Sequence, residues 1–207
     1  MKSGIRLQPL REATRALFAF LFFFGMSWST SAESEKPLSA IFLVARSELS
    51  DPLFKDSIVL VMNNVGPLPA GVILNRPTRI SVSDLFPDFQ RLTQLQDKVY
   101  LGGPVELRSV WYLFRADAQP QHSIRVLDGV YVSTNRDLLH KLLGRDKPME
   151  GLRIFIGHSS WAPGQLEGEI ARGDWTLAPA DKDAIFNGKF EHPWPEEEDV
   201  PDAARHT

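Results

Sequence analysis

Residues 109–132 read SVWYLFRADAQPQHSIRVLDGVYV and decide the class of fold. Residues 109–114 form an apolar run that is mostly β-branched and aromatic, which is the composition of a buried strand. Residues 123–127 and 130–132 flank Asp128-Gly129, a pair preferred in the type I′ turn of a tight hairpin. The stretch therefore predicts antiparallel strands that follow one another along the chain.

Shorter apolar runs bounded by Gly, Pro and Asn continue this pattern on both sides. We expect further strands at residues 40–45, 57–62, 70–74, 98–101, 152–157 and 174–177. We expect helices at residues 83–86, 134–143, 163–172 and 180–186, with Thr134 as the N-cap of the second and Pro163 in the first turn of the third. Because strands outnumber helices, the prediction is an α+β domain: a mixed, largely antiparallel sheet with helices packed outside it.

The first 32 residues have the pattern of an export signal. Four basic side chains precede an apolar run at residues 16–28, which is shorter than the roughly 20 residues of a membrane-spanning helix. Thr30-Ser31-Ala32 then places small residues where a signal peptidase cleaves, so we predict cleavage after Ala32 and a periplasmic or secreted protein. Retention of the segment as an uncleaved anchor is the alternative, and no stable membrane span is expected after cleavage.

The remaining chain is expected to hold one domain. Residues 33–39 form a polar lead-in, residues 40–190 the folded domain, and residues 191–207 an acidic tail. The chain has 207 residues and no cysteine, which excludes disulfides and thiolate metal sites. Loss of residues 1–32 removes four basic and one acidic side chain and changes the net charge from -3 to about -6. This acidic balance argues against a nucleic-acid partner.

Residues 157–161 read GHSSW and place a histidine beside two serines. Neighbours on an extended segment point to opposite faces, so His158 is badly placed to activate Ser159. The five histidines of the chain show no metal-ligand spacing. We therefore predict no catalytic residues, no metal ligands and no cofactor. A hydrolase-like enzyme that uses the strand-end loops is kept as the alternative.

Two loops that follow strands are the candidate ligand site. Asn75-Arg76-Pro77 and Gly102-Gly103-Pro104 each break a strand, and Arg76 offers a guanidinium fork suited to an anion. The hypothesis is that Asn75, Arg76, Gly102 and Gly103 converge beside the helix expected to begin at Pro163. In the alternative reading, Arg76 pairs with Glu167 or Glu169 and Asn75 caps a turn.

The helix expected at residues 163–172 contains glycine and needs tertiary contacts to persist. Trp161 and Trp175 flank it, so both are expected to be mainly structural. Gln165 and Glu169 lie four residues apart, as a pair on one helix surface does. Trp161, Gln165 and Glu169 nevertheless complete the set of candidate ligand-binding residues.

Taken together, several segments resemble the YqgE/AlgH family. They are residues 42–45, 51–54, 57–60, 71–77 and 102–105 and, above all, Trp161-Ala162-Pro163-Gly164-Gln165-Leu166-Glu167-Gly168-Glu169-Ile170, followed by Trp175. The resemblance covers residues 40–190 and implies a split sheet curled into a partial barrel. It implies no activity and no catalytic residues. Some family members are linked to regulation of exopolysaccharide production.

The chain departs from the family pattern in two respects. Family members usually carry a histidine near the position of Asn63-Asn64, where this chain has none. They are also mostly cytoplasmic, whereas this chain has the pattern of an export signal. We therefore interpret the chain as an exported, non-catalytic binding or accessory protein with an unknown protein or a small anionic ligand as its partner. A transcription-related regulator is the further alternative, which the charge and the export signal disfavour.

Overall fold

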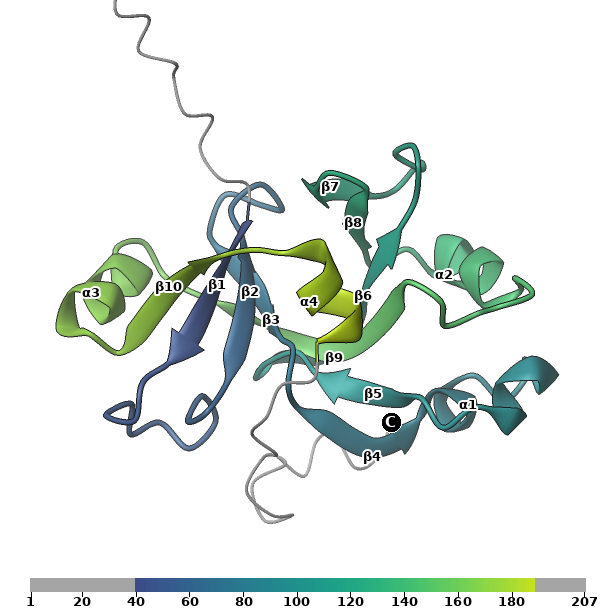
Figure 1. The fold of residues 1–207 in the computed structure, drawn as a ribbon, viewed down its shortest axis with the longest axis horizontal. Helices are drawn as coiled ribbons and strands as arrows, with labels where there is room; N and C mark the ends of the chain where they lie inside the picture. Colours follow the sequence, from purple (N-terminus) through teal and green to yellow (C-terminus); the bar gives the residue numbers. More distant parts are fainter. Residues whose placement is uncertain (1–39, 189–207) are drawn as a thin grey trace, which may run out of the picture. The chain divides into compact units, whose positions relative to one another are not determined.

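The computed structural model describes residues 40–188, which form one curled sheet with helices packed against it (Figure 1). The strands are β1 (Ala40–Ala45), β2 (Ile58–Met62), β3 (Ala70–Ile73), β4 (Pro77–Ser81), β5 (Lys98–Leu101), β6 (Val105–Arg115), β7 (Ile124–Leu127), β8 (Val130–Ser133), β9 (Leu152–Ser160) and β10 (Trp175–Pro179). The helices are α1 (Val82–Leu85), the 3-10 helix η1 (Gln90–Gln94), α2 (Arg136–Leu143), α3 (Gln165–Arg172) and α4 (Lys182–Asn187). Within the described part of the chain, none of these helices is long and apolar enough to cross a membrane.

The sheet is largely antiparallel, as predicted. Its strand order is β10-β1-β2-β3-β9-β6-β8-β7, and β4 and β5 branch from this path. The strand pair β5 and β9 is parallel, whereas the other pairs recorded between residues 40 and 188 are antiparallel. The expected α+β half-barrel is therefore confirmed. The predicted lead-in, the export segment and the acidic tail lie outside the described residues.

The core of the half-barrel lies between the two halves of the curled sheet. Leu60 and Val72 face it from one half, and Leu113 and Val132 face it from the other. Figure 1 shows α4 between these halves, and its Ile185 is fully buried in the same cluster. Burial of such side chains stabilises the fold by about 1.5–3 kcal/mol each relative to exposure.

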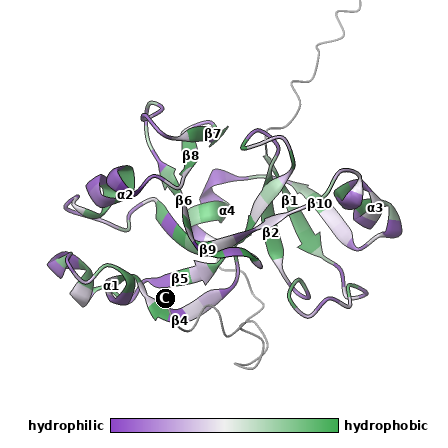
Figure 2. Cartoon of the chain, turned by 180° about the vertical axis from the view of Figure 1, so that it is seen from behind, coloured by the Kyte–Doolittle hydropathy of each residue, from purple (hydrophilic) through white to green (hydrophobic). Residues whose placement is uncertain are grey.

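Two further clusters cover the outer faces of the sheet. Helix α3 packs Leu166 against Leu43 and Val59, while α2 packs Leu139 and Leu143 against the opposite half. Figure 2 shows hydrophobic and hydrophilic residues alternating along both helices, as expected for helices with one buried side. Helices α2 and α3 therefore lie outside the sheet, in agreement with the prediction, whereas α4 packs against its inner face.

The starts of α2 and α3 differ from the sequence prediction for identifiable reasons. Helix α2 is capped by Asn135, whose side chain accepts from the amide of Leu138, so Thr134 is not the N-cap. Helix α3 begins at Gln165 rather than Pro163, because Gly164 is left-handed with φ 76°. The turn before α3 thus places Pro163 ahead of the helix.

The hairpin between β7 and β8 forms where it was expected, but the prediction of a type I′ turn was wrong. A type I′ turn needs positive φ at both central residues, and only Gly129 has it, at 72°. Strand β4, which begins at Pro77 and pairs with β5, was not predicted from the sequence. Proline is compatible with the first residue of a strand, so the break predicted at Pro77 is the start of a new pairing.

Candidate functional site

Asn75 and Arg76 follow β3 and are almost completely buried, with exposed fractions of 8% and 2%. The Asn75 side chain accepts from the amide of Ile58 at 2.9 Å and donates to the carbonyl of Asp56 at 2.8 Å. Arg76 Nη2 donates to the carbonyl of Lys55 at 2.8 Å. Asp56 has φ 56°, an unfavourable conformation for a residue with a side chain. The two side chains therefore hold the strained loop that precedes β2.

Gly102 and Gly103 lie where β5 passes close to β9. The amide of Gly102 donates to Ile156 at 2.8 Å, and its carbonyl accepts from Ile73 at 3.0 Å. A Cβ atom on Gly102 would come within 2.3 Å of the Gly157 carbonyl oxygen, and one on Gly103 within 2.4 Å of the His158 carbonyl. The space beside both glycines is filled by protein backbone.

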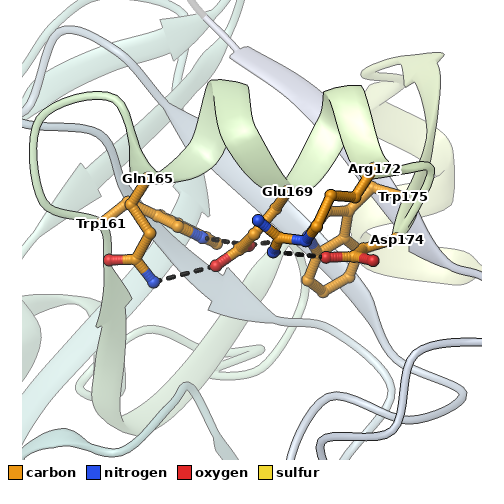
Figure 3. Close-up of polar contacts among 6 residues, drawn as sticks. All are labelled: Trp161, Gln165, Glu169, Arg172, Asp174 and Trp175. Atoms are coloured by element: carbon orange, nitrogen blue, oxygen red, sulfur yellow. Dashed lines mark hydrogen bonds and ion pairs between the residues drawn. The ribbon is translucent and has the colours of Figure 1, made fainter.

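The helix α3 motif forms a polar network (Figure 3). Glu169 Oε2 accepts from the indole nitrogens of Trp161 at 3.0 Å and Trp175 at 2.9 Å, and Oε1 accepts from Gln165 at 2.9 Å. Both tryptophans are buried, at 3% and 4% exposed. The carboxylate therefore ties α3 to the end of β9 and to the start of β10. The expected pairing of Gln165 with Glu169 is confirmed.

The seven candidate residues do not gather at one point. Trp161, Gln165 and Glu169 lie together at α3, and the Trp161 amide donates to Pro69, just before β3. Asn75 and Arg76 follow the opposite end of the same strand. Ligand binding by these residues stays a prediction. Their observed contacts are those of structural side chains.

Residues 157–160 of the GHSSW segment lie in β9, and His158 and Ser159 make separate contacts. Ser159 is 1% exposed and its hydroxyl donates to the Gly102 carbonyl at 3.1 Å. The His158 ring instead stacks on Trp111, with centroids 4.7 Å apart. Burial lowers the pKa of His158, and the negative charge of Glu106 opposes this only in part, which favours a neutral imidazole near pH 7. These contacts give no support to a His158–Ser159 hydrolytic pair.

A cleft that was not predicted from the sequence lies beside α2. Its volume is about 350 Å³, and the residues that line it are Leu85, Phe86, Pro87, Asp88, Phe89, Ser109, Val110, Thr134, Arg136, Leu139 and His140. The rings of Phe86 and Phe89 meet His140 edge-on, with centroids 6.4 and 5.3 Å apart. Arg136 is exposed and makes no ion pair with any described residue. Apolar walls with one available cation are typical of a small-ligand site.

A second cleft is larger, at about 600 Å³, and lies between η1 and the loop before β9. Its charged side chains already pair with one another: Arg91 with Asp146 at 2.6 Å and Lys147 with Glu150 at 3.1 Å. The smaller cleft is therefore the better candidate, because its cation is available to a ligand. No group of three or more potential metal ligands occurs between residues 40 and 188.

The half-barrel and its α3 network define an α+β protein in which α2, α3 and α4 each pack against a different hydrophobic cluster of one curled sheet. The chain belongs to the AlgH-like family, whose sequence pattern matches residues 42–197. It is 33% identical over 159 residues to a UPF0301 protein of Histophilus somni, covering 74% of this chain and 84% of the relative. It is 32% identical over 158 residues to a UPF0301 protein of Neisseria gonorrhoeae, covering 75% and 86%.

Two solved structures share the fold. The solution structure of the AlgH protein from Pseudomonas aeruginosa aligns with a TM-score of 0.60 at 27% identity, over 72% of this chain and 81% of that one. A crystal structure of a protein from Corynebacterium diphtheriae aligns with a TM-score of 0.58 at 27% identity, over 73% and 80%. The family resemblance seen in the sequence is thus confirmed.

Proposed function

We propose that this protein is an exported, non-catalytic binding protein that holds a small organic anion in the cleft beside α2. The observation that carries the proposal is the combination of Phe86 and Phe89 with Arg136 in one cleft of about 350 Å³. The rings offer apolar area to the body of a ligand, and the guanidinium offers paired donors to a carboxylate. Asp88 lines the same cleft and disfavours ligands with several negative charges.

The chemistry of the walls narrows the ligand further. A cleft of this volume is at the lower end of the range for small-molecule sites, about 300–1,000 Å³. Thr134 adds a hydroxyl that can donate to a second ligand oxygen. We therefore propose a monocarboxylate with a compact apolar group, for which benzoate and phenylacetate are suitable probes.

Arg136→Ala should weaken the binding of phenylacetate roughly ten- to hundredfold, because a hydrogen bond to a charged group contributes about 1.5–3 kcal/mol. Isothermal titration calorimetry of the purified protein measures this change. Lys141→Ala is the matched control, since it removes the same charge from an exposed position of α2 that does not line the cleft. Equal losses in both variants, or no binding of either probe to the wild type, would overturn the proposal.

Export makes a separate prediction. Protein recovered from the cell envelope should begin at Glu33, because Thr30-Ser31-Ala32 follows the basic start and the apolar run. Intact-mass measurement decides this. Ala32→Phe should block cleavage while leaving the apolar run intact, so the uncleaved form should accumulate. A wild-type species that starts at Met1 and stays in the cytosol would contradict export.

A further inference from the structure

The two clefts lie next to each other, between the same two parts of the chain. One wall is formed by α1, η1 and the loop between them, and the other by α2 and the loop that follows it. Phe89 lines the α2 cleft, and Gln90, the next residue, lines the larger cleft. On the opposite wall, the α2 cleft extends to His140 and the larger cleft begins at Asp146. Figures 1 and 2 both show α1 and α2 as neighbours on one side of the half-barrel, so the clefts follow one another along a single groove.

Packing beneath the groove fixes the distance between its walls. Leu92 of η1 and Leu143 of α2 are fully buried in one hydrophobic cluster. Nearer the surface, Arg91 of η1 donates to Asp146 across the groove at 2.6 Å. Both side chains of this ion pair are exposed, so a ligand can displace the pair at little cost. The groove is therefore formed before a ligand arrives, which lowers the entropic cost of binding.

The two parts of the groove offer different chemistry. The α2 cleft presents aromatic rings and the guanidinium of Arg136. In the larger cleft each cation is paired with an acid, so this cleft has no net charge. It presents instead the side-chain amides of Gln90 and Gln94, which are exposed and make no hydrogen bond within residues 40–188. A glutamine amide both donates and accepts, which is the pattern that a peptide backbone requires.

We propose, on the basis of the function proposed above, that the ligand of the α2 cleft is the C-terminal residue of a partner polypeptide, whose preceding residues lie in the larger cleft. The terminal carboxylate binds Arg136. The terminal side chain is aromatic or large and apolar, and packs against Phe86 and Phe89. Gln90 and Gln94 bond to the backbone of the residues before it.

The length of α2 sets the length of the bound segment. Arg136 is the first residue of this helix, and the larger cleft begins beyond the end of the helix. The helix has 8 residues and is therefore about 12 Å long. An extended chain advances about 3.3 Å per residue, so a segment of about four residues reaches from one cleft into the other. Because the charges of the larger cleft are balanced, we expect uncharged side chains at the preceding positions.

The test is isothermal titration calorimetry of the purified full chain with three ligands: the tetrapeptide acetyl-Leu-Ala-Ala-Phe, the same peptide with a C-terminal carboxamide, and phenylacetate. The free peptide should bind roughly ten times more tightly than phenylacetate, because each added hydrogen bond to its backbone contributes about two- to tenfold in affinity. The carboxamide lacks the charge that Arg136 recognises, so it should bind roughly ten- to hundredfold more weakly than the free peptide.

Gln94→Ala should weaken the binding of the free peptide roughly two- to tenfold and leave that of phenylacetate unchanged, because Gln94 lines only the larger cleft. Gln96→Ala is the matched control, since Gln96 is exposed and lines neither cleft. It should change neither affinity. Thermal unfolding midpoints equal to that of the wild type show that both variants are folded.

The peptide proposal is overturned if the free peptide binds no more tightly than phenylacetate, if the carboxamide binds equally well, or if Gln94→Ala and Gln96→Ala have the same effect. In each of these cases phenylacetate still binds through Arg136, and the proposed function stands. If phenylacetate does not bind, or binds equally well to Arg136→Ala, the proposed function itself is wrong and the peptide proposal falls with it.

Discussion

Trp161→Ala should lower the free energy of unfolding by about 3–5 kcal/mol, the usual cost of truncating a well-buried tryptophan. The side chain is 3% exposed and packs in the cluster under α3 with Val61 and Leu166. The substitution opens a cavity there and also removes one of the two indole donors to Glu169 Oε2. Equilibrium denaturant unfolding followed by circular dichroism measures the loss as a lower midpoint.

Leu177→Ala is the control for this experiment, because Leu177 is 50% exposed and its truncation should change stability by no more than about 0.5 kcal/mol. Trp161→Phe separates packing from hydrogen bonding, since it keeps a ring but loses the indole donor. Combined with Glu169→Gln in a double-mutant cycle, it should show a coupling energy of about 0.5–3 kcal/mol. A midpoint for Trp161→Ala equal to that of Leu177→Ala would mean that the tryptophan does not hold α3.

Strands could be predicted from the sequence because their signal is local. Residues 40–45 form an apolar run, and residues 98–101 are apolar after Lys98; the structure has strands with the same bounds. Helix starts were less accurate because a cap depends on one hydrogen bond. Thr134 and Asn135 are both good N-cap residues, and only the bond from Leu138 to Asn135 decides between them.

The candidate site was harder to predict because its residues come from separate parts of the chain. The α2 cleft takes Phe86 and Phe89 from one loop, Ser109 from β6 and Arg136 from α2. No short motif spans these positions. Arg76 was singled out for its charge, but an arginine in a sequence does not reveal whether its guanidinium meets solvent or a backbone carbonyl. The structure shows the second case, at Lys55.

Gly102→Ala should destabilise the fold by about 3 kcal/mol or more, at the upper end of the cost of overpacking. The added Cβ would lie 2.3 Å from the Gly157 carbonyl oxygen, and backbone on both sides is fixed by the bonds of Gly102 to Ile156 and Ile73. A flexible side chain in the way of the new Cβ could move aside, but the clashing atoms are backbone. Two hydrogen-bonded strands would therefore have to separate to make room. Loss of the cooperative unfolding transition, or a much lower midpoint, is the expected result.

Gly66→Ala is the matched control, because a Cβ at Gly66 meets nothing within 4 Å and its backbone does not need positive φ. That substitution should be neutral or should stabilise the fold by about 0.4–1 kcal/mol, because alanine lowers the conformational entropy of the unfolded chain. If Gly102→Ala unfolds at the same midpoint as Gly66→Ala, β5 does not pass β9 as closely as described. The glycine would then be free for the ligand-binding role predicted from the sequence. If only Gly102→Ala loses stability, the small size of Gly102 serves the crossing of two strands, and the α2 cleft is the better candidate for a ligand site.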